Sequence, residues 1–77
     1  MPLKVYGYDS CPFCQRVYTC MDDQNIMFER VDIDPWDRSV VVELSGQSQV
    51  PVLEDTDRDE IIPDSQVIVD YLEEHYT

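Results

Sequence analysis

Two cysteines separated by two residues, Cys11 and Cys14, stand between a short apolar run and a segment with helical features. Residues 3–7 (LKVYG) predict a β-strand, and residues 8–10 predict the polar loop that leaves it. Pro12 favours a helix start, because the first helical turn needs no hydrogen bond from the proline nitrogen. The pair therefore belongs where a strand ends and a helix over residues 12–23 begins, and this constrains the fold of the whole chain.

The same order predicts different roles for the two thiols. Cys11 falls at the N-cap of the expected helix, beside free backbone N–H groups and the positive end of the helix dipole. These groups stabilise a thiolate, which is the nucleophile in disulfide exchange. Cys14 follows one helical turn later and is placed to attack a mixed disulfide at Cys11. A strand, a C-x-x-C motif and a helix in this order are typical of a thioredoxin-like redox site.

The composition predicts one small acidic domain over residues 1–77. The hydrophobic share of 43% is sufficient for a globular core. No apolar run is long enough to span a bilayer, and no secretory signal precedes the first strand. Of the three cysteines, two lie in the C-x-x-C motif, which argues against a secreted disulfide framework. We therefore expect a soluble cytoplasmic protein.

The charge is strongly negative, with 17 acidic against 5 basic residues and a formal net charge of −12. Such a chain should repel nucleic acid and anionic membranes. The acids are spread over every segment, and our hypothesis is a halophilic-type surface adapted to a salt-rich cytoplasm. Molar salt shortens the screening length to about 3 Å, so the thermal midpoint should be higher in molar KCl than in dilute buffer. Equal midpoints would contradict this hypothesis.

The rest of the chain predicts alternating elements. Residues 28–33, 50–54 and 59–62 are expected strands, residues 55–58 a polar turn, and residues 36–44 a helix that ends near Gly46. A last helix is expected to start at Asp64 or Ser65. The order β-α-β-α-β-β-α predicts an α/β fold with a four-stranded mixed sheet flanked by helices, in which the first two strands are parallel.

Three motifs resemble those of the glutaredoxins, specifically those whose thioredoxin-like domain matches the N-terminal domain of glutathione transferases. They are residues 8–14 (YDSCPFC), residues 49–53 (QVPVL), and residues 63–65 (PDS) followed by Ile68, Tyr71 and Leu72. The motifs occur in the family's order and spacing and cover nearly the whole chain. The resemblance implies a thioredoxin-like (glutaredoxin) fold.

The resemblance also implies how a small thiol is held. It implies a cis bond between Val50 and Pro51, which turns the Val50 backbone outward to pair with a bound thiol. Asp64 and Ser65 occupy the positions where the family holds the γ-glutamyl group; ordinary helix capping is the alternative, and both roles can coexist. The expected substrate-binding residues are Phe13, Gln49, Val50, Pro51, Asp64 and Ser65.

The implied function is that of a glutathione-dependent disulfide oxidoreductase, active in electron transport and cell redox homeostasis. Cys11 and Cys14 would reduce protein disulfides and mixed disulfides, with glutathione or a related γ-glutamyl thiol as co-substrate and no metal. The expected partners are small thiols and disulfide-containing proteins, and the expected state is a monomer. Classical glutaredoxins often hold the glycine carboxylate with two bases, whose positions here are Tyr8 and Gln47. This departure suggests weaker dependence on glycine, and even use of γ-glutamylcysteine, unless it is only a subfamily trait.

Other functions and other residues were weighed. The alternatives are an iron–sulfur or metal carrier, which Pro12 and Cys14 disfavour, a non-catalytic thiol-binding module, and a transferase acting on electrophiles. Arg16 could assist the thiol or simply be solvated. Cys20 is expected as a small buried residue, with a regulatory thiol as the alternative. His75 is expected as a structural or surface residue, and the sequence lacks the second close pair of ligands that a zinc site would need. Tyr6, Phe28, Trp36 and Tyr71 are expected in the core or in helix packing.

Overall fold

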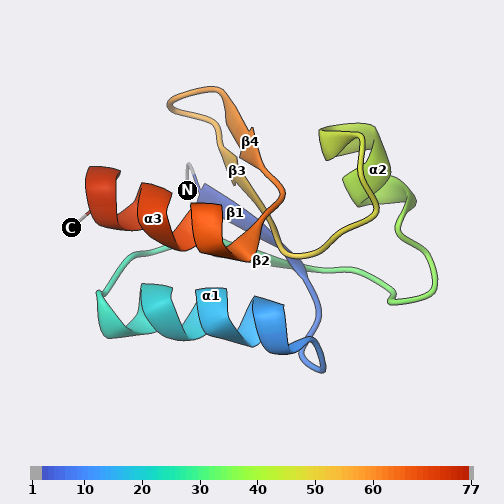
Figure 1. Cartoon of the computed structure of the whole chain (residues 1–77), viewed down its shortest axis with the longest axis horizontal. Helices are drawn as coiled ribbons and strands as arrows, with labels where there is room; N and C mark the ends of the chain where they lie inside the picture. Colours follow the sequence, from blue (N-terminus) through green and yellow to red (C-terminus); the bar gives the residue numbers. More distant parts are fainter. Residues whose placement is uncertain (1–2, 77) are drawn as a thin grey trace.

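The computed structural model describes residues 3–76 and contains the expected elements in the expected order (Figure 1). The elements are β1 (Leu3–Gly7), α1 (Pro12–Asp23), β2 (Glu29–Asp32), α2 (Ser39–Ser45), β3 (Val52–Asp55), β4 (Glu60–Ile62) and α3 (Ser65–His75). The predicted bounds of β1 and α1 are confirmed, and the later strands are shorter than the sequence patterns suggested.

The strands form one mixed sheet in the order β2-β1-β3-β4. β1 pairs in parallel with β2, where Val5 lies opposite Arg30, and antiparallel with β3, where it lies opposite Leu53. β3 and β4 form the antiparallel hairpin. The predicted four-stranded mixed sheet is confirmed. Its topology brings the end of β1, the start of α1 and the start of β3 to one edge of the molecule.

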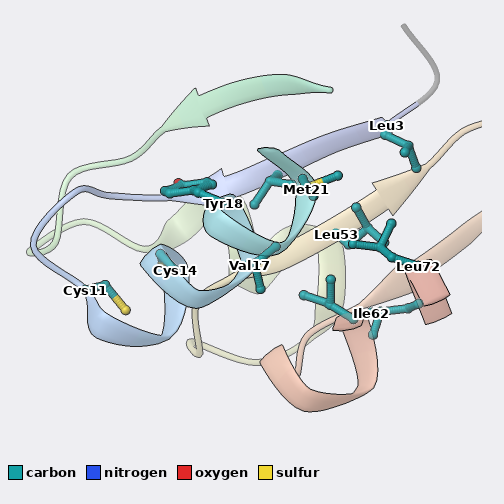
Figure 2. Packing of buried hydrophobic residues seen from close by; sticks show 11 residues of the cluster. Leu3, Cys11, Cys14, Val17, Tyr18, Met21, Leu53, Ile62 and Leu72 are labelled. Carbon is teal, nitrogen blue, oxygen red and sulfur yellow. The ribbon is translucent and has the colours of Figure 1, made fainter. Parts of the chain in front are cut away.

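The main core lies between the sheet and the helices α1 and α3, which pack against each other (Figures 1 and 2). Alternate residues of β1 are buried on this face, because side chains of a strand point to opposite sides in turn. Burying a Leu, Val or Ile side chain contributes about 1.5–3 kcal/mol. The fully or almost fully buried residues of this core include Leu3, Val5, Val17, Met21, Leu53, Ile68 and Leu72.

The helix expected at residues 36–44 begins later, at Ser39. The Oδ1 atom of Asp34 accepts a hydrogen bond from the backbone N–H of Trp36 at 2.9 Å, and that of Asp37 accepts one from Ser39 at 3.2 Å. Aspartates that bind the backbone two residues on favour turns over helix. Trp36 is 95% exposed, so the expectation that it lies in the core or in helix packing is wrong. At the other end, α2 stops as predicted at Gly46, whose φ of 78° suits glycine.

One carboxylate, that of Asp55 at the end of β3, is completely buried. Its Oδ2 atom accepts hydrogen bonds from the hydroxyls of Tyr71 at 2.6 Å and Tyr76 at 2.5 Å, and its Oδ1 atom accepts from the backbone N–H groups of Asp57 and Arg58. Burial alone would raise the pKa of Asp55, but these hydrogen bonds outweigh it and lower the pKa. The expectation that residue 55 only opens a polar turn is therefore incomplete: it joins the hairpin to α3.

Within residues 3–76, the helices are too short or too polar for any of them to cross a lipid bilayer.

Candidate active site

Cys11 occupies the N-cap of α1, as the sequence predicted. Its backbone is extended (φ −86°, ψ 118°), Pro12 follows at the first helical position, and the Cys11 carbonyl accepts the N–H of Gln15 at 3.0 Å. The Cys11 N–H donates to the carbonyl of Tyr8 at 3.3 Å and so fixes the loop from β1. The residue is 5% exposed, and Figure 2 shows its side chain at the start of the helix.

Cys14 lies one turn further into α1 and is fully buried. A Cβ atom on Gly7 would lie 2.5 Å from its sulfur, so the close approach of α1 to β1 requires glycine at this position. Burial raises the pKa of the Cys14 thiol to about 12, and the neighbouring Cys11 acts in the same direction. A backbone hydrogen bond from Tyr8 and the positive charge of Arg38 oppose this increase. Cys14 is therefore poorly suited to be the first nucleophile at neutral pH.

A pocket of about 630 Å³ opens beside Cys11. Its walls come from the start of α1, the loop before α2, the segment before β3 and the start of α3. Among the described residues, the lining is Tyr8, Ser10, Cys11, Pro12, Phe13, Pro35, Arg38, Gln49, Val50, Pro63, Asp64 and Ser65. The structure thus brings together six of the predicted site residues, while Cys14 and the buried Pro51 lie outside the lining.

Two of the predicted binding segments have a defined backbone geometry at this pocket. The peptide bond between Val50 and Pro51 is cis, as the resemblance implied. Asp64 is the N-cap of α3, and its Oδ1 atom accepts the N–H groups of Gln66 at 2.9 Å and Val67 at 3.2 Å. The capping role of Asp64 is therefore confirmed, and its role in binding a substrate stays a prediction.

Arg38 brings a positive charge to the pocket that the sequence did not reveal. Its guanidinium donates to the carbonyls of Pro35 and Ser48 and, at 3.1 Å, to the hydroxyl of Tyr8. The expectation that no basic side chain is available for the glycine carboxylate of glutathione considered only residues 8 and 47, and it overlooked Arg38. Gln47 does not line the pocket, whereas Tyr8 does and accepts the Arg38 hydrogen bond. The position of Arg38 depends on segments distant in sequence, so no local pattern indicates it.

Three other residues lie outside the pocket lining. Arg16 donates a hydrogen bond of 2.5 Å to Gln66 and links α1 to α3. Cys20 is only partly buried, so the expectation of a buried residue is wrong, and burial is the main cause that raises the pKa of its thiol. His75 packs its ring against that of Tyr71, with centroids 4.6 Å apart.

The mixed sheet, the C-x-x-C pair at the start of α1 and the cis peptide bond between the pocket residue Val50 and the buried Pro51 define the class of thioredoxin-like domains. Within this class, residues 5–77 match the N-terminal domain of glutathione S-transferases. The chain therefore belongs to the glutathione S-transferase N-terminal domain family, and the predicted resemblance is confirmed.

Two proteins and one solved structure illustrate the similarity. The chain is 32% identical over 71 residues to glutaredoxin 2 of Escherichia coli K12, covering 92% of this chain and 33% of that protein. It is 33% identical over 67 residues to the chloroplastic glutathione S-transferase DHAR3 of Arabidopsis thaliana, covering 86% and 25%. The crystal structure of glutaredoxin 2 from Salmonella typhimurium in complex with glutathione matches with a TM-score of 0.83 and 33% identity, covering 91% and 32%. The chain thus spans a third or less of the length of these relatives.

Proposed function

We propose that this protein is a glutaredoxin-type thiol–disulfide oxidoreductase that uses glutathione or a related γ-glutamyl thiol. The observation that carries the proposal is the position of Cys11: it caps α1 and lines the pocket that Val50, Asp64 and Ser65 also line. A reactive sulfur and a peptide-sized binding pocket at one place suit exchange with a small thiol. The relatives whose names include glutaredoxin or glutathione S-transferase support this reading.

In the proposed mechanism, Cys11 reacts as a thiolate, because the helix start favours negative charge on its sulfur. It attacks the accessible sulfur of a glutathionylated substrate, releases the substrate thiol and becomes the mixed disulfide. A second glutathione then attacks this disulfide, or Cys14 attacks it and forms the internal Cys11–Cys14 bond. Burial of Cys14 leaves Cys11 as the thiol that faces the substrate.

The pocket offers separate groups for the two ends of glutathione. At the start of α3, the Ser65 hydroxyl and the positive end of the helix dipole suit the α-carboxylate of the γ-glutamyl group. The N–H groups of Gln66 and Val67 already donate to Oδ1 of Asp64, and the second carboxylate oxygen of Asp64 suits the ammonium. Arg38 lines the same pocket from another segment and suits the glycine carboxylate, since guanidinium groups pair well with carboxylates. Phe13, which is 59% exposed, supplies an apolar wall next to Cys11.

The direct test is a turnover assay with the purified protein and a glutathionylated peptide, in which glutathione and γ-glutamylcysteine are compared as reductants. We expect release of the peptide thiol at a rate that depends on protein concentration and on the small thiol. No catalysis with any γ-glutamyl thiol would contradict the proposed function. A carrier of an iron–sulfur cluster would instead purify as a brown protein.

Replacing Arg38 by Gln should raise the KM for glutathione about tenfold, because one charge-assisted hydrogen bond is lost. The ethyl ester of glutathione, which carries no charge on its glycine, should bind the natural protein more weakly. The same ester should bind Arg38→Gln no more weakly than glutathione does, because the effects of two changes at one contact are not additive.

The Arg38 guanidinium also holds the carbonyls of Pro35 and Ser48, so the thermal midpoint of the variant is measured in parallel. Arg16→Gln is the matched control, since it removes the same charge from outside the pocket lining. An unchanged KM in Arg38→Gln, or an ester effect that persists in this variant, would show that Arg38 does not bind the glycine carboxylate.

A further inference from the structure

The hydroxyl of Tyr18 is buried but forms no hydrogen bond with the residues that the structure describes. Tyr18 lies on α1 and is 5% exposed, with its ring stacked on that of Phe28 and the Arg30 guanidinium 4.3 Å from its centroid. The ring is thus packed on both sides, yet its Oη atom makes no hydrogen bond within residues 3–76. Buried hydroxyls almost always have a partner, because an unsatisfied one destabilises the folded state. A buried hydroxyl without a partner therefore needs an explanation, and a role in the reaction is one.

The Tyr18 hydroxyl lies next to the resolving thiol. Tyr18 follows Cys14 by four residues, so the two side chains lie on one face of α1. Both approach Gly7 of β1: a Cβ atom there would lie 2.5 Å from the Cys14 sulfur and 3.0 Å from the Tyr18 oxygen. The missing side chain of Gly7 thus leaves these two polar atoms as neighbours in an otherwise apolar part of the core.

We infer that Tyr18 donates a hydrogen bond from its hydroxyl to the sulfur of Cys14 when this sulfur becomes a thiolate in the resolving step. This inference rests on the proposed function and assigns a further residue to its second half. The Cys14 sulfur attacks the Cys11 sulfur of the mixed disulfide, a Cys11–Cys14 bond forms, and the bond from Cys11 to the glutathione sulfur breaks. The Cys11 sulfur stays at the disulfide level, the Cys14 sulfur is oxidised from thiolate to disulfide, and the glutathione sulfur is reduced from disulfide to thiolate, so the exchange needs no external oxidant. The departing glutathione thiolate takes up, through solvent, the proton that Cys14 loses.

The electrostatics agree with a donor that keeps its own proton. Burial, followed by the charge of Cys14, raises the pKa of Tyr18 to about 12, so its hydroxyl is protonated at neutral pH. Two other charged or titratable groups act on Cys14, namely Cys11 and Arg38. The charges of Asp32 and Cys11 act on Tyr18, and the Arg30 guanidinium contacts its ring. Removing the hydroxyl leaves all of these groups in place, so a change in pH dependence would report on the hydrogen bond itself.

The test measures the two phases of oxidation separately. The first phase forms the mixed disulfide between Cys11 and glutathione, and the second phase forms the internal Cys11–Cys14 disulfide. Reduced protein in a Cys20→Ser background is mixed with glutathione disulfide and quenched with acid, and mass spectrometry distinguishes the glutathionylated form from the internal disulfide. In Tyr18→Phe, the first phase should keep its rate, and the second should be about threefold slower at neutral pH, because the thiolate population falls about tenfold while the remaining thiolate is about threefold more nucleophilic. The pH profile of the second phase should move upward by about one unit.

The control is Tyr6→Phe, which removes the hydroxyl that donates to Glu54 at 2.8 Å and should leave both phases unchanged. The thermal midpoint of Tyr18→Phe should equal or exceed that of the parent, because a buried hydroxyl without a partner is lost. A second phase with unchanged rate and pH profile, or equal slowing of both phases, would overturn the inference, as would a large fall in the midpoint.

Failure of the proposed function is separable from failure of this inference. If glutathione disulfide forms no mixed disulfide with the parent protein, the proposed use of glutathione is wrong. An activated aromatic disulfide, which needs no binding site for a γ-glutamyl thiol, then loads Cys11 and keeps the second phase measurable. The slower second phase of Tyr18→Phe should persist with this reagent, and its absence would overturn the role of Tyr18.

Discussion

Replacing Cys11 by Ser should abolish both the reduction of protein disulfides and the removal of glutathione from mixed disulfides, leaving only the uncatalysed rate. A serine hydroxyl cannot form a disulfide, and the remaining thiol of the site, Cys14, is fully buried with its pKa raised to about 12 by burial. The measurement is turnover of a glutathionylated peptide and, separately, of a protein disulfide. Mass spectrometry should find no glutathione adduct in the variant at residue 14.

The matched variant is Cys14→Ser, which keeps Cys11, the thiol that lines the pocket. Glutathione can still resolve the mixed disulfide at Cys11, so removal of glutathione from a peptide should continue, whereas reduction of protein disulfides should weaken. Cys20→Ser, which changes a thiol outside the pocket lining, should leave both reactions unchanged. Activity that survives in Cys11→Ser would overturn the assignment of the nucleophile.

The sequence predicted the elements whose signals are local. The strand before Cys11, the proline at the first helical position and the helical spacing that follows all act within about twenty residues, and β1 and α1 have the predicted bounds. The parallel pairing of β1 and β2 follows from the handedness of the β-α-β connection. The cis bond before Pro51 was predicted from the resemblance and not from chain physics.

What the sequence did not predict depends on contacts between distant segments. Arg38 reaches the pocket because it binds the carbonyl of Ser48 and the hydroxyl of Tyr8, ten and thirty residues away. Trp36 is an exception, because its exposure has a local cause: Asp34 and Asp37 each accept a hydrogen bond from the backbone two residues on, and these turns replace the expected first turn of the helix and leave the indole in solvent. That the Tyr18 hydroxyl lacks a hydrogen bond and lies near Cys14 depends on how α1 packs against Gly7 of β1, which no local sequence pattern indicates.

Asp55 shows both a local signal and a distant contact. Its polar neighbours in sequence suggest an exposed turn, whereas tyrosine side chains in and just after α3 bury its carboxylate. Replacing Asp55 by Ala should lower the free energy of unfolding by about 3 kcal/mol, since two tyrosine hydroxyls and two backbone N–H groups lose a charged acceptor. For a domain of this size that is a fall of about 15 °C in the thermal midpoint.

The pH dependence of this contribution has a definite sign. Because the folded-state pKa of Asp55 is lowered, its stabilising effect is fully present above the unfolded value of about 3.9 and is lost as the pH falls through the folded value. The difference in unfolding free energy between the parent and Asp55→Ala should therefore be constant near neutrality and shrink at acid pH. Asp57→Ala removes an exposed charge from the same hairpin and should not destabilise, because the net charge of −12 is reduced. A loss in Asp57→Ala as large as that in Asp55→Ala would show that hairpin charge, and not the buried hydrogen bonds to α3, stabilises this end of the domain.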